Sequence, residues 1–146
     1  MHPSLRMTLA VLAGLLVGNL VNGGLIALGP MIIPLPEEVD PQNMESLMAN
    51  MHRFEAKHFI MPFLAHALGT LLGAFVAAKL VRRHRMRAAM IVGAFFFLAG
   101  IANVILLMAA PLWFKIADLL LAYFPFAYLG GKLAGKDPLS QHSSNV

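Results

Sequence analysis

Four long apolar stretches dominate the pattern of hydrophobic and polar positions along the chain. The most regular of them carries no Asp, Glu, Lys or Arg over the twenty residues from Phe59 to Ala78. At ~1.5 Å of rise per residue, a helix of that length spans the ~30 Å apolar core of a bilayer. The pattern therefore predicts an all-α membrane protein, with four transmembrane helices in an antiparallel bundle. We expect these helices over residues 7–28, 57–81, 88–108 and 112–130, within a domain of residues 1–135 that is followed by a polar tail, 136–146.

The longest connection, between the first two predicted helices, has a helical pattern of its own. Four apolar residues recur in it at helical spacing and would form one stripe: Met44, Leu47, Met48 and Met51. Asp40 followed by Pro41 is typical of a helix start, with the aspartate as N-cap. The sequence therefore predicts a short amphipathic helix over about residues 41–52. Such a helix would lie on the membrane surface or over the mouth of the bundle.

Small residues recur every four positions along one side of two predicted helices. In the first helix they are Gly14 and Gly18, and in the second they are Ala65, Gly69, Gly73 and Ala77. Small side chains let two helix backbones approach closely. Within lipid, where the hydrophobic effect does not drive helices together, this close packing stabilises their association. We therefore expect packing seams at these positions, either within the bundle or between copies of the chain. The seams also favour self-association.

Composition supports the membrane assignment and narrows the possible partners. Of the 146 residues, 59% are hydrophobic and 12% are charged, whereas soluble domains are about 25% charged. The chain contains no cysteine, which excludes disulfide and thiolate chemistry. The formal net charge is +4, but the cations cluster at the ends of apolar segments, as membrane topology requires. The lipid bilayer, and not a nucleic acid, is the expected partner.

Lysine and arginine are distributed unevenly between the two sides of the predicted bundle. With both termini inside, the outer side holds three of them, Arg53, Lys57 and Lys115. The inner side then holds eight: Arg6, Lys79, Arg82, Arg83, Arg85, Arg87, Lys132 and Lys136. The positive-inside rule therefore predicts cytoplasmic N- and C-termini in a bacterial inner membrane. The acidic first loop and the turn at residues 109–111 would lie outside.

Polar residues within the predicted helices fall at the midplane or in the outer half of the membrane. A polar group that faces lipid is costly, so we expect these side chains to face protein or water. Because the inner halves of the helices are almost entirely apolar, the pattern predicts a polar cavity that opens outward beneath the loop helix. The candidate cavity residues are Asn19, Asn22, His66, Thr70, Asn103 and Asp118.

Two of these residues allow both a structural and a functional interpretation. Lys115 lies one turn before Asp118, and a pair between them would merely fix the helix near the outer interface. Alternatively, Asp118 takes part in function. His66 would bind a proton or a metal, or it would donate a structural hydrogen bond to one of the asparagines.

A possible metal site lies where the loop meets the second helix. Glu55 and His58 are three residues apart, a spacing that di-metal helical bundles use. Together with His66 they would offer nitrogen and oxygen ligands to a divalent metal. The competing interpretation pairs Glu55 with Lys57 or Arg53 and places His58 among the lipid headgroups.

Three functions are compatible with these features. The first is a homo-oligomeric carrier or pore, in which the outward-facing cavity admits a small solute or ion. The second is an integral membrane enzyme that acts on a lipid or quinone-like substrate through a His/Glu/Asp metal or acid–base site. The third is an assembly subunit without chemistry. The sequence alone leaves the choice between enzyme and non-enzyme open.

Overall fold

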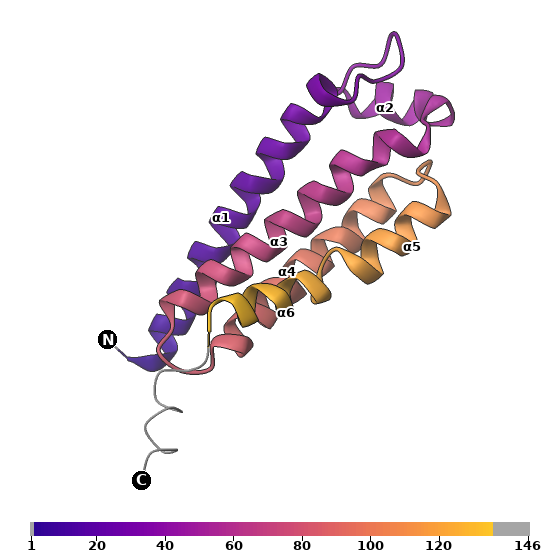
Figure 1. Ribbon diagram of the computed structural model, residues 1–146. Coiled ribbons are helices and arrows are strands. Elements are labelled where there is room, and N and C mark those ends of the chain that lie inside the picture. Colours follow the sequence, from indigo (N-terminus) through magenta and orange to yellow (C-terminus); the bar gives the residue numbers. More distant parts are fainter. Residues whose placement is uncertain (1, 136–146) are drawn as a thin grey trace.

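The computed structural model of the protein describes residues 2–135 as an all-α bundle, which confirms the predicted fold class (Figure 1). Its four long apolar elements pack antiparallel, and each is long and apolar enough to cross a membrane. The chain is therefore a small integral membrane protein. The predicted tail, residues 136–146, lies outside the described residues. The long elements are α1 (Pro3–Ile32), α3 (Ile60–Leu80), α4 (Arg85–Leu106), and a fourth made of α5 (Leu112–Leu121) and α6 (Phe124–Leu133).

The helix α3 is the central element of the bundle, because it packs against α1, α4 and α6. Its contact with α1 is the most extensive between any two helices, and glycines make it possible. A Cβ atom added to Gly14 would lie 2.5 Å from the carbonyl oxygen of Gly73. One added to Gly18 would lie 2.7 Å from that of Gly69. The predicted seams thus meet each other inside one chain, with Ala65 and Ala77 fully buried beside them.

The helix α6 closes the other side of α3 and α4 in the same way. A Cβ atom on Gly130 would lie 2.5 Å from the carbonyl oxygen of Leu71, and one on Gly93 would lie 2.5 Å from the Cβ of Ala127. Small residues therefore bring α1, α3, α4 and α6 into close contact over the half of the bundle nearest residues 2 and 135. Little space is left between the helices in that half.

The structure corrects the prediction of one unbroken helix over residues 112–130. Ala122 and Tyr123 interrupt it, so that α5 ends at Leu121 and α6 begins at Phe124. Pro125 explains the break, because proline has no backbone N–H and its ring clashes with the carbonyl group four residues earlier. That carbonyl belongs to Leu121, the last residue of α5. In the first turn of α6 the same proline is well accommodated.

The first connection also differs in detail from its prediction. Its helix, α2 (Met44–Asn50), is shorter than residues 41–52 and continues into 3₁₀ turns at Met51–Arg53 and Ala56–Phe59. Asn43, and not Asp40, is the N-cap, because its side chain accepts hydrogen bonds from two backbone N–H groups of α2. The first helix is longer than residues 7–28 at both ends. Figure 1 shows α2 at the end of the bundle opposite the N-terminus.

Replacing a seam glycine with leucine should destabilise the bundle. We expect Gly73→Leu to lower the free energy of unfolding by about 2 kcal/mol or more, because its side chain would collide with the α1 backbone. Gly24→Leu is the matched control, since a Cβ atom there meets nothing within 4 Å. It should be neutral or stabilising by up to about 1 kcal/mol from helix propensity. Thermal unfolding in detergent measures both, and equal stability of the two variants would contradict the seam.

Candidate functional site

A cavity of about 340 Å³ lies at the end of the bundle that carries α2. Its wall is formed by the C-terminal half of α1, the first connection with α2, the start of α3, the end of α4, and α5. This volume falls within the ~300–1,000 Å³ of typical small-molecule sites. The cavity is therefore large enough to hold a ligand within a chain of this size.

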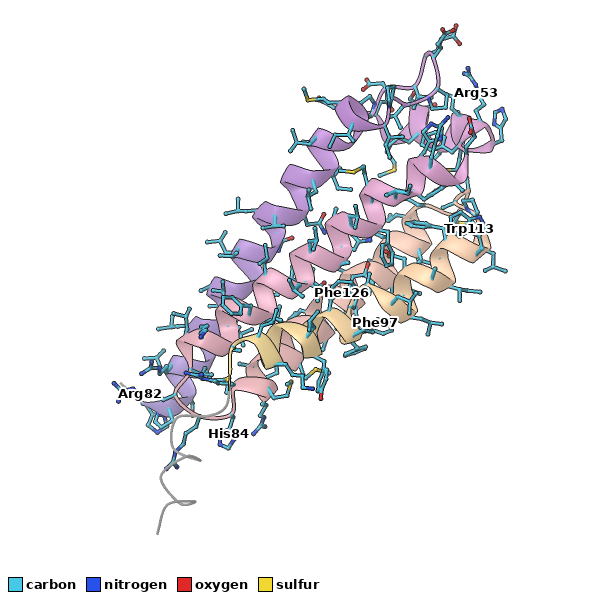
Figure 2. All side chains as sticks on the ribbon, viewed as in Figure 1. Arg53, Arg82, His84, Phe97, Trp113 and Phe126 are labelled. Atoms are coloured by element: carbon cyan, nitrogen blue, oxygen red, sulfur yellow. The ribbon has the colours of Figure 1, made fainter. Side chains whose placement is uncertain are left out.

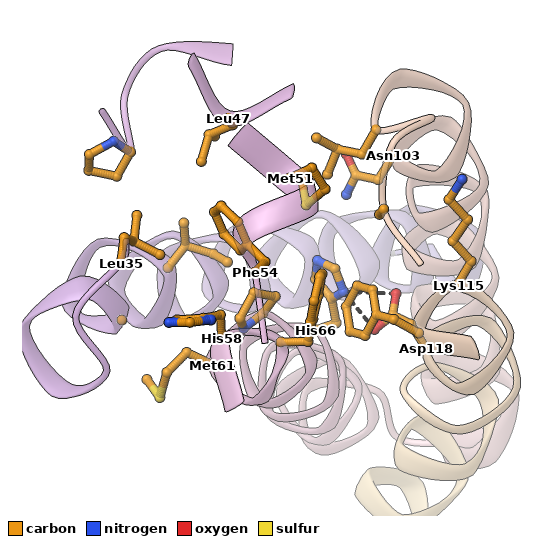
Figure 3. A pocket seen from close by; sticks show the side chains of 18 of the residues that line it. Leu35, Leu47, Met51, Phe54, His58, Met61, His66, Asn103, Lys115 and Asp118 are labelled. Carbon is orange, nitrogen blue, oxygen red and sulfur yellow. Dashed lines mark hydrogen bonds and ion pairs between the residues drawn. The ribbon is translucent and has the colours of Figure 1, made fainter. Parts of the chain in front are cut away.

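The cavity has an apolar side and a polar side (Figure 3). Apolar side chains come mainly from α1 and the first connection, and include Leu35, Leu47, Met51 and Phe54. Most polar side chains lie on the other side, on α3, α4 and α5, and these are His66, Asn103, Lys115 and Asp118. His58 also lines the cavity, but Figure 3 shows it among the apolar residues, near Leu35 and Met61. A molecule that fills the cavity would therefore meet hydrocarbon on one side and hydrogen-bonding groups on the other.

A hydrogen-bonded network of three side chains forms the core of the polar side. Nδ1 of His66 lies 2.8 and 2.9 Å from the two carboxylate oxygens of Asp118. The hydroxyl of Tyr123 donates to Oδ2 of Asp118 at 2.9 Å, and its ring stacks on the His66 ring at 5.8 Å between centroids. Asp118 is 3% exposed and Tyr123 is 1% exposed. The carboxylate is thus shielded from solvent and held by two donors from different elements.

The network also determines which nitrogen of His66 is free for a ligand. An ionised carboxylate only accepts hydrogen bonds, so Nδ1 of His66 must carry the hydrogen that it shares with Asp118. Figure 3 shows the other ring nitrogen pointing away from Asp118, toward the side of the cavity where Met51 lies. In the neutral ring this Nε2 is a proton acceptor. His66 therefore offers the cavity a base whose orientation is fixed by Asp118.

Tyr123 is the member of this network that the sequence did not reveal as a candidate. In one continuous helix, residues 118 and 123 would point about 140° apart, because successive residues are rotated by ~100°. The break before α6 removes this restriction and lets the Tyr123 hydroxyl reach Asp118. Gly100 on α4 provides the space, since a Cβ atom there would lie 2.5 Å from the Tyr123 hydroxyl oxygen. Pro125 was the signal in the sequence that could have revealed this arrangement.

Of the other predicted cavity residues, two line the cavity, one is exposed and one is buried away from the cavity. Asn22 and Asn103 line the cavity together with His66 and Asp118. Asn19 is exposed, and its side-chain amide donates to the carbonyl oxygen of Leu15. Thr70 is fully buried but does not line the cavity, and its hydroxyl donates to the carbonyl oxygen of His66 at 2.7 Å.

Lys115 does not form the pair with Asp118 that one interpretation of the sequence allowed. Its ammonium group donates to the carbonyl oxygen of Met108 at 2.8 Å. Within residues 2–135 it forms no ion pair with Asp118, whose hydrogen-bond donors are His66 and Tyr123. Lys115 thus anchors the turn between α4 and α5 and lines the cavity without neutralising its carboxylate.

The residues suggested for a metal, Glu55, His58 and His66, are not assembled as a set. No group of three or more His, Asp or Glu side chains suited to a metal occurs in the described part of the chain. Glu55 contacts the Lys57 ammonium at 3.1 Å, as the competing interpretation expected. His58 is 7% exposed, and its Nδ1 accepts a hydrogen bond of 2.8 Å from the backbone N–H of Glu55.

Comparisons of the chain with protein-family models, with curated proteins and with solved structures find no match. The function of the cavity must therefore be argued from its own residues.

Removing the Tyr123 hydroxyl should destabilise the protein, because a buried carboxylate then loses one of its two donors. We expect Tyr123→Phe to cost about 1–3 kcal/mol of unfolding free energy, measured by thermal or denaturant unfolding in detergent. Tyr128→Phe is the matched control, because Tyr128 is 49% exposed, and it should be near neutral. The effects of Tyr123→Phe and Asp118→Asn should not add in the double variant. Full additivity would show that the two side chains are uncoupled.

Proposed function

We propose that the protein binds a small amphipathic molecule within the membrane, in the cavity between α1, α3, α4 and α5. The observation that carries this proposal is the buried network of His66, Asp118 and Tyr123 at one wall of an otherwise mainly apolar cavity. Ionisable groups inside membrane-spanning segments are expensive and mark functional sites by default. An amphipathic ligand would satisfy both sides of the cavity at once.

The packing beyond the cavity favours a binding site over a pore. On the side of residues 2 and 135, α1 and α3 are in backbone contact at Gly14, Gly18, Gly69 and Gly73. This contact leaves little room for a water-filled path along the bundle. The small-residue ridge of α3 is covered by α1, and so it gives no support to a homo-oligomeric carrier. A molecule that enters the cavity would therefore leave by the end at which it entered.

The orientation of His66 favours a second candidate function, acid–base catalysis on a lipid or quinone-like substrate. A general base needs a free nitrogen that faces the substrate and a partner that stabilises the imidazolium form. Nε2 of His66 points away from Asp118 in Figure 3, and the Asp118 carboxylate is the stabilising partner. In this function the bound molecule would give a proton to Nε2, and the ion pair with Asp118 would offset the cost of the buried positive charge.

The distribution of cations supports an outward-facing cavity. Figure 2 shows Arg82 and His84 at one end of the bundle, with Arg53 and Trp113 at the other. Most lysines and arginines lie at the first end, which the positive-inside rule assigns to the cytoplasm. The cavity lies near the second end, so its ligand would enter from the outer half of the membrane.

Accessibility of single cysteines should reveal this topology, because the natural chain has no cysteine. In intact cells, we expect a membrane-impermeant maleimide to label Glu38→Cys in the exposed first connection. Arg83→Cys, exposed in the connection between α3 and α4, should react only after the membrane is permeabilised. The reverse pattern would place the cavity on the cytoplasmic side.

Filling the cavity should abolish ligand binding without affecting the fold. We expect 1-decanol, used as an amphipathic probe, to raise the Tm of the purified protein in detergent by several degrees, because it binds the native state. Val104→Trp places a large ring in the cavity wall and should remove this shift. Ile105→Trp is the matched control, since Ile105 is 64% exposed, and it should retain the shift. An equal response from the two variants would rule out the cavity as the binding site.

A further inference from the structure

The hydrogen-bonding groups that line the cavity are not all used within the protein, and those left over indicate what the ligand carries. Lys115 has three N–H donors, of which one is directed to the carbonyl oxygen of Met108. In the part of the chain that the structure describes, its positive charge has no carboxylate partner. Lys115 lines the cavity, and Figure 3 shows its side chain on the same side as Asn103 and Asp118. The cavity therefore presents a cation whose charge is available to a ligand.

His58 adds a second donor to the cavity. Its Nδ1 accepts a hydrogen bond from the backbone N–H of Glu55, so this nitrogen carries no hydrogen. The ring is then neutral, with its hydrogen on Nε2. His58 lines the cavity, and this N–H remains for a ligand.

The negative charge of Asp118, in contrast, is already engaged. Its two oxygens accept hydrogen bonds from His66 and Tyr123. A cationic ligand would compete with these donors for the carboxylate. Besides Asp118, the ionisable side chains of the cavity wall offer donors on Lys115 and His58 and an acceptor at Nε2 of His66.

We infer that the ligand of this cavity is a lipophilic carboxylic acid, with its carboxyl group beside Lys115 and His66 and its hydrocarbon chain against the apolar side. The inference rests on the proposed binding function and specifies the chemical class of the molecule. A carboxylate accepts several hydrogen bonds and pairs with an ammonium group, and a protonated carboxyl group also donates to an imidazole nitrogen. The apolar chain would lie along Leu47, Met51 and Phe54 (Figure 3).

Charge balance explains how such a molecule is accommodated inside a membrane. Before binding, the Asp118 carboxylate is held by hydrogen bonds from His66 and Tyr123, and the Lys115 ammonium by the carbonyl oxygen of Met108. A neutral carboxylic acid that enters transfers its carboxyl proton to Nε2 of His66. The products are two ion pairs: the ligand carboxylate with Lys115, and the His66 imidazolium with Asp118. Binding therefore leaves the net charge of the cavity unchanged and gives each buried charge an opposite partner.

The cavity, at about 340 Å³, lies near the lower end of the ~300–1,000 Å³ that is typical of small-molecule sites. A medium-chain fatty acid is therefore a probe of suitable size.

Decanoic acid and 1-decanol provide a matched pair of probes, because they differ in the head group alone. At neutral pH and below the micelle-forming concentration, we expect decanoate to shift the Tm of the wild type more than decanol does. The shift should correspond to an apparent affinity about tenfold higher, as expected for charge-assisted hydrogen bonds. Lys115→Met should bind the two probes about equally, whereas Lys115→Arg should keep the preference for the acid. The comparison is made within each variant, so a general loss of stability does not affect it.

The outcomes distinguish this inference from the function on which it rests. If the wild type responds to decanol as strongly as to decanoate, or if Lys115→Met keeps the preference for decanoate, the ligand is not an acid held by Lys115. In either case the proposal that the cavity binds an amphipathic molecule is unaffected. If neither probe shifts the Tm of the wild type, both the cavity's binding function and the inference about its ligand are overturned.

Discussion

The carboxylate of Asp118 is the constraint on which the polar half of this molecule depends. It lies in an apolar, membrane-length element and is almost completely buried, so without hydrogen-bond donors it would cost several kcal/mol. Its two donors come from α3 and from the break between α5 and α6. The kink at Pro125, the space at Gly100 and the orientation of His66 are all needed for this one group to be satisfied. The geometry of the cavity wall therefore follows from the electrostatics of one residue.

The two halves of the bundle pack differently, and each kind of packing has its own purpose. Toward residues 2 and 135, glycine and alanine bring α1, α3, α4 and α6 into close contact, and dispersion over these surfaces supplies the stability that lipid cannot. Toward α2, the helices enclose open volume, and α5 makes only limited contacts with α3 and α4. A rigid half thus supports a half that can admit a ligand.

The sequence predicts the features that depend on local pattern and misses those that depend on backbone geometry. Apolar length defines the four membrane helices, and small residues at four-residue spacing define the seam, because both are properties of a regular helix. The Asp118–Tyr123 bond depends on an interruption of the helix, so reasoning at 100° per residue places these side chains on different faces. A pair between Lys115 and Asp118 was one of two interpretations that the sequence left open, and it does not form. Nearness along the chain did not reveal that the carbonyl oxygen of Met108 would accept from Lys115 instead. His66 and Asp118 were both recognised as candidates, but their direct contact joins residues 52 positions apart, and periodicity carries no information at that range.

A purely structural role explains the network less well than a binding role does. Interhelical hydrogen bonds in a membrane protein need only two neutral partners, such as an asparagine and a backbone carbonyl. Here the chain uses a carboxylate, an imidazole and a phenol, and it leaves open volume beside them that larger side chains at positions such as Val104 and Ala110 would fill. Filling that volume would add dispersion contacts and raise stability. The chain does not have this added stability, and it keeps an ionisable group and an oriented nitrogen at the cavity wall. A ligand that occupies the space explains both features.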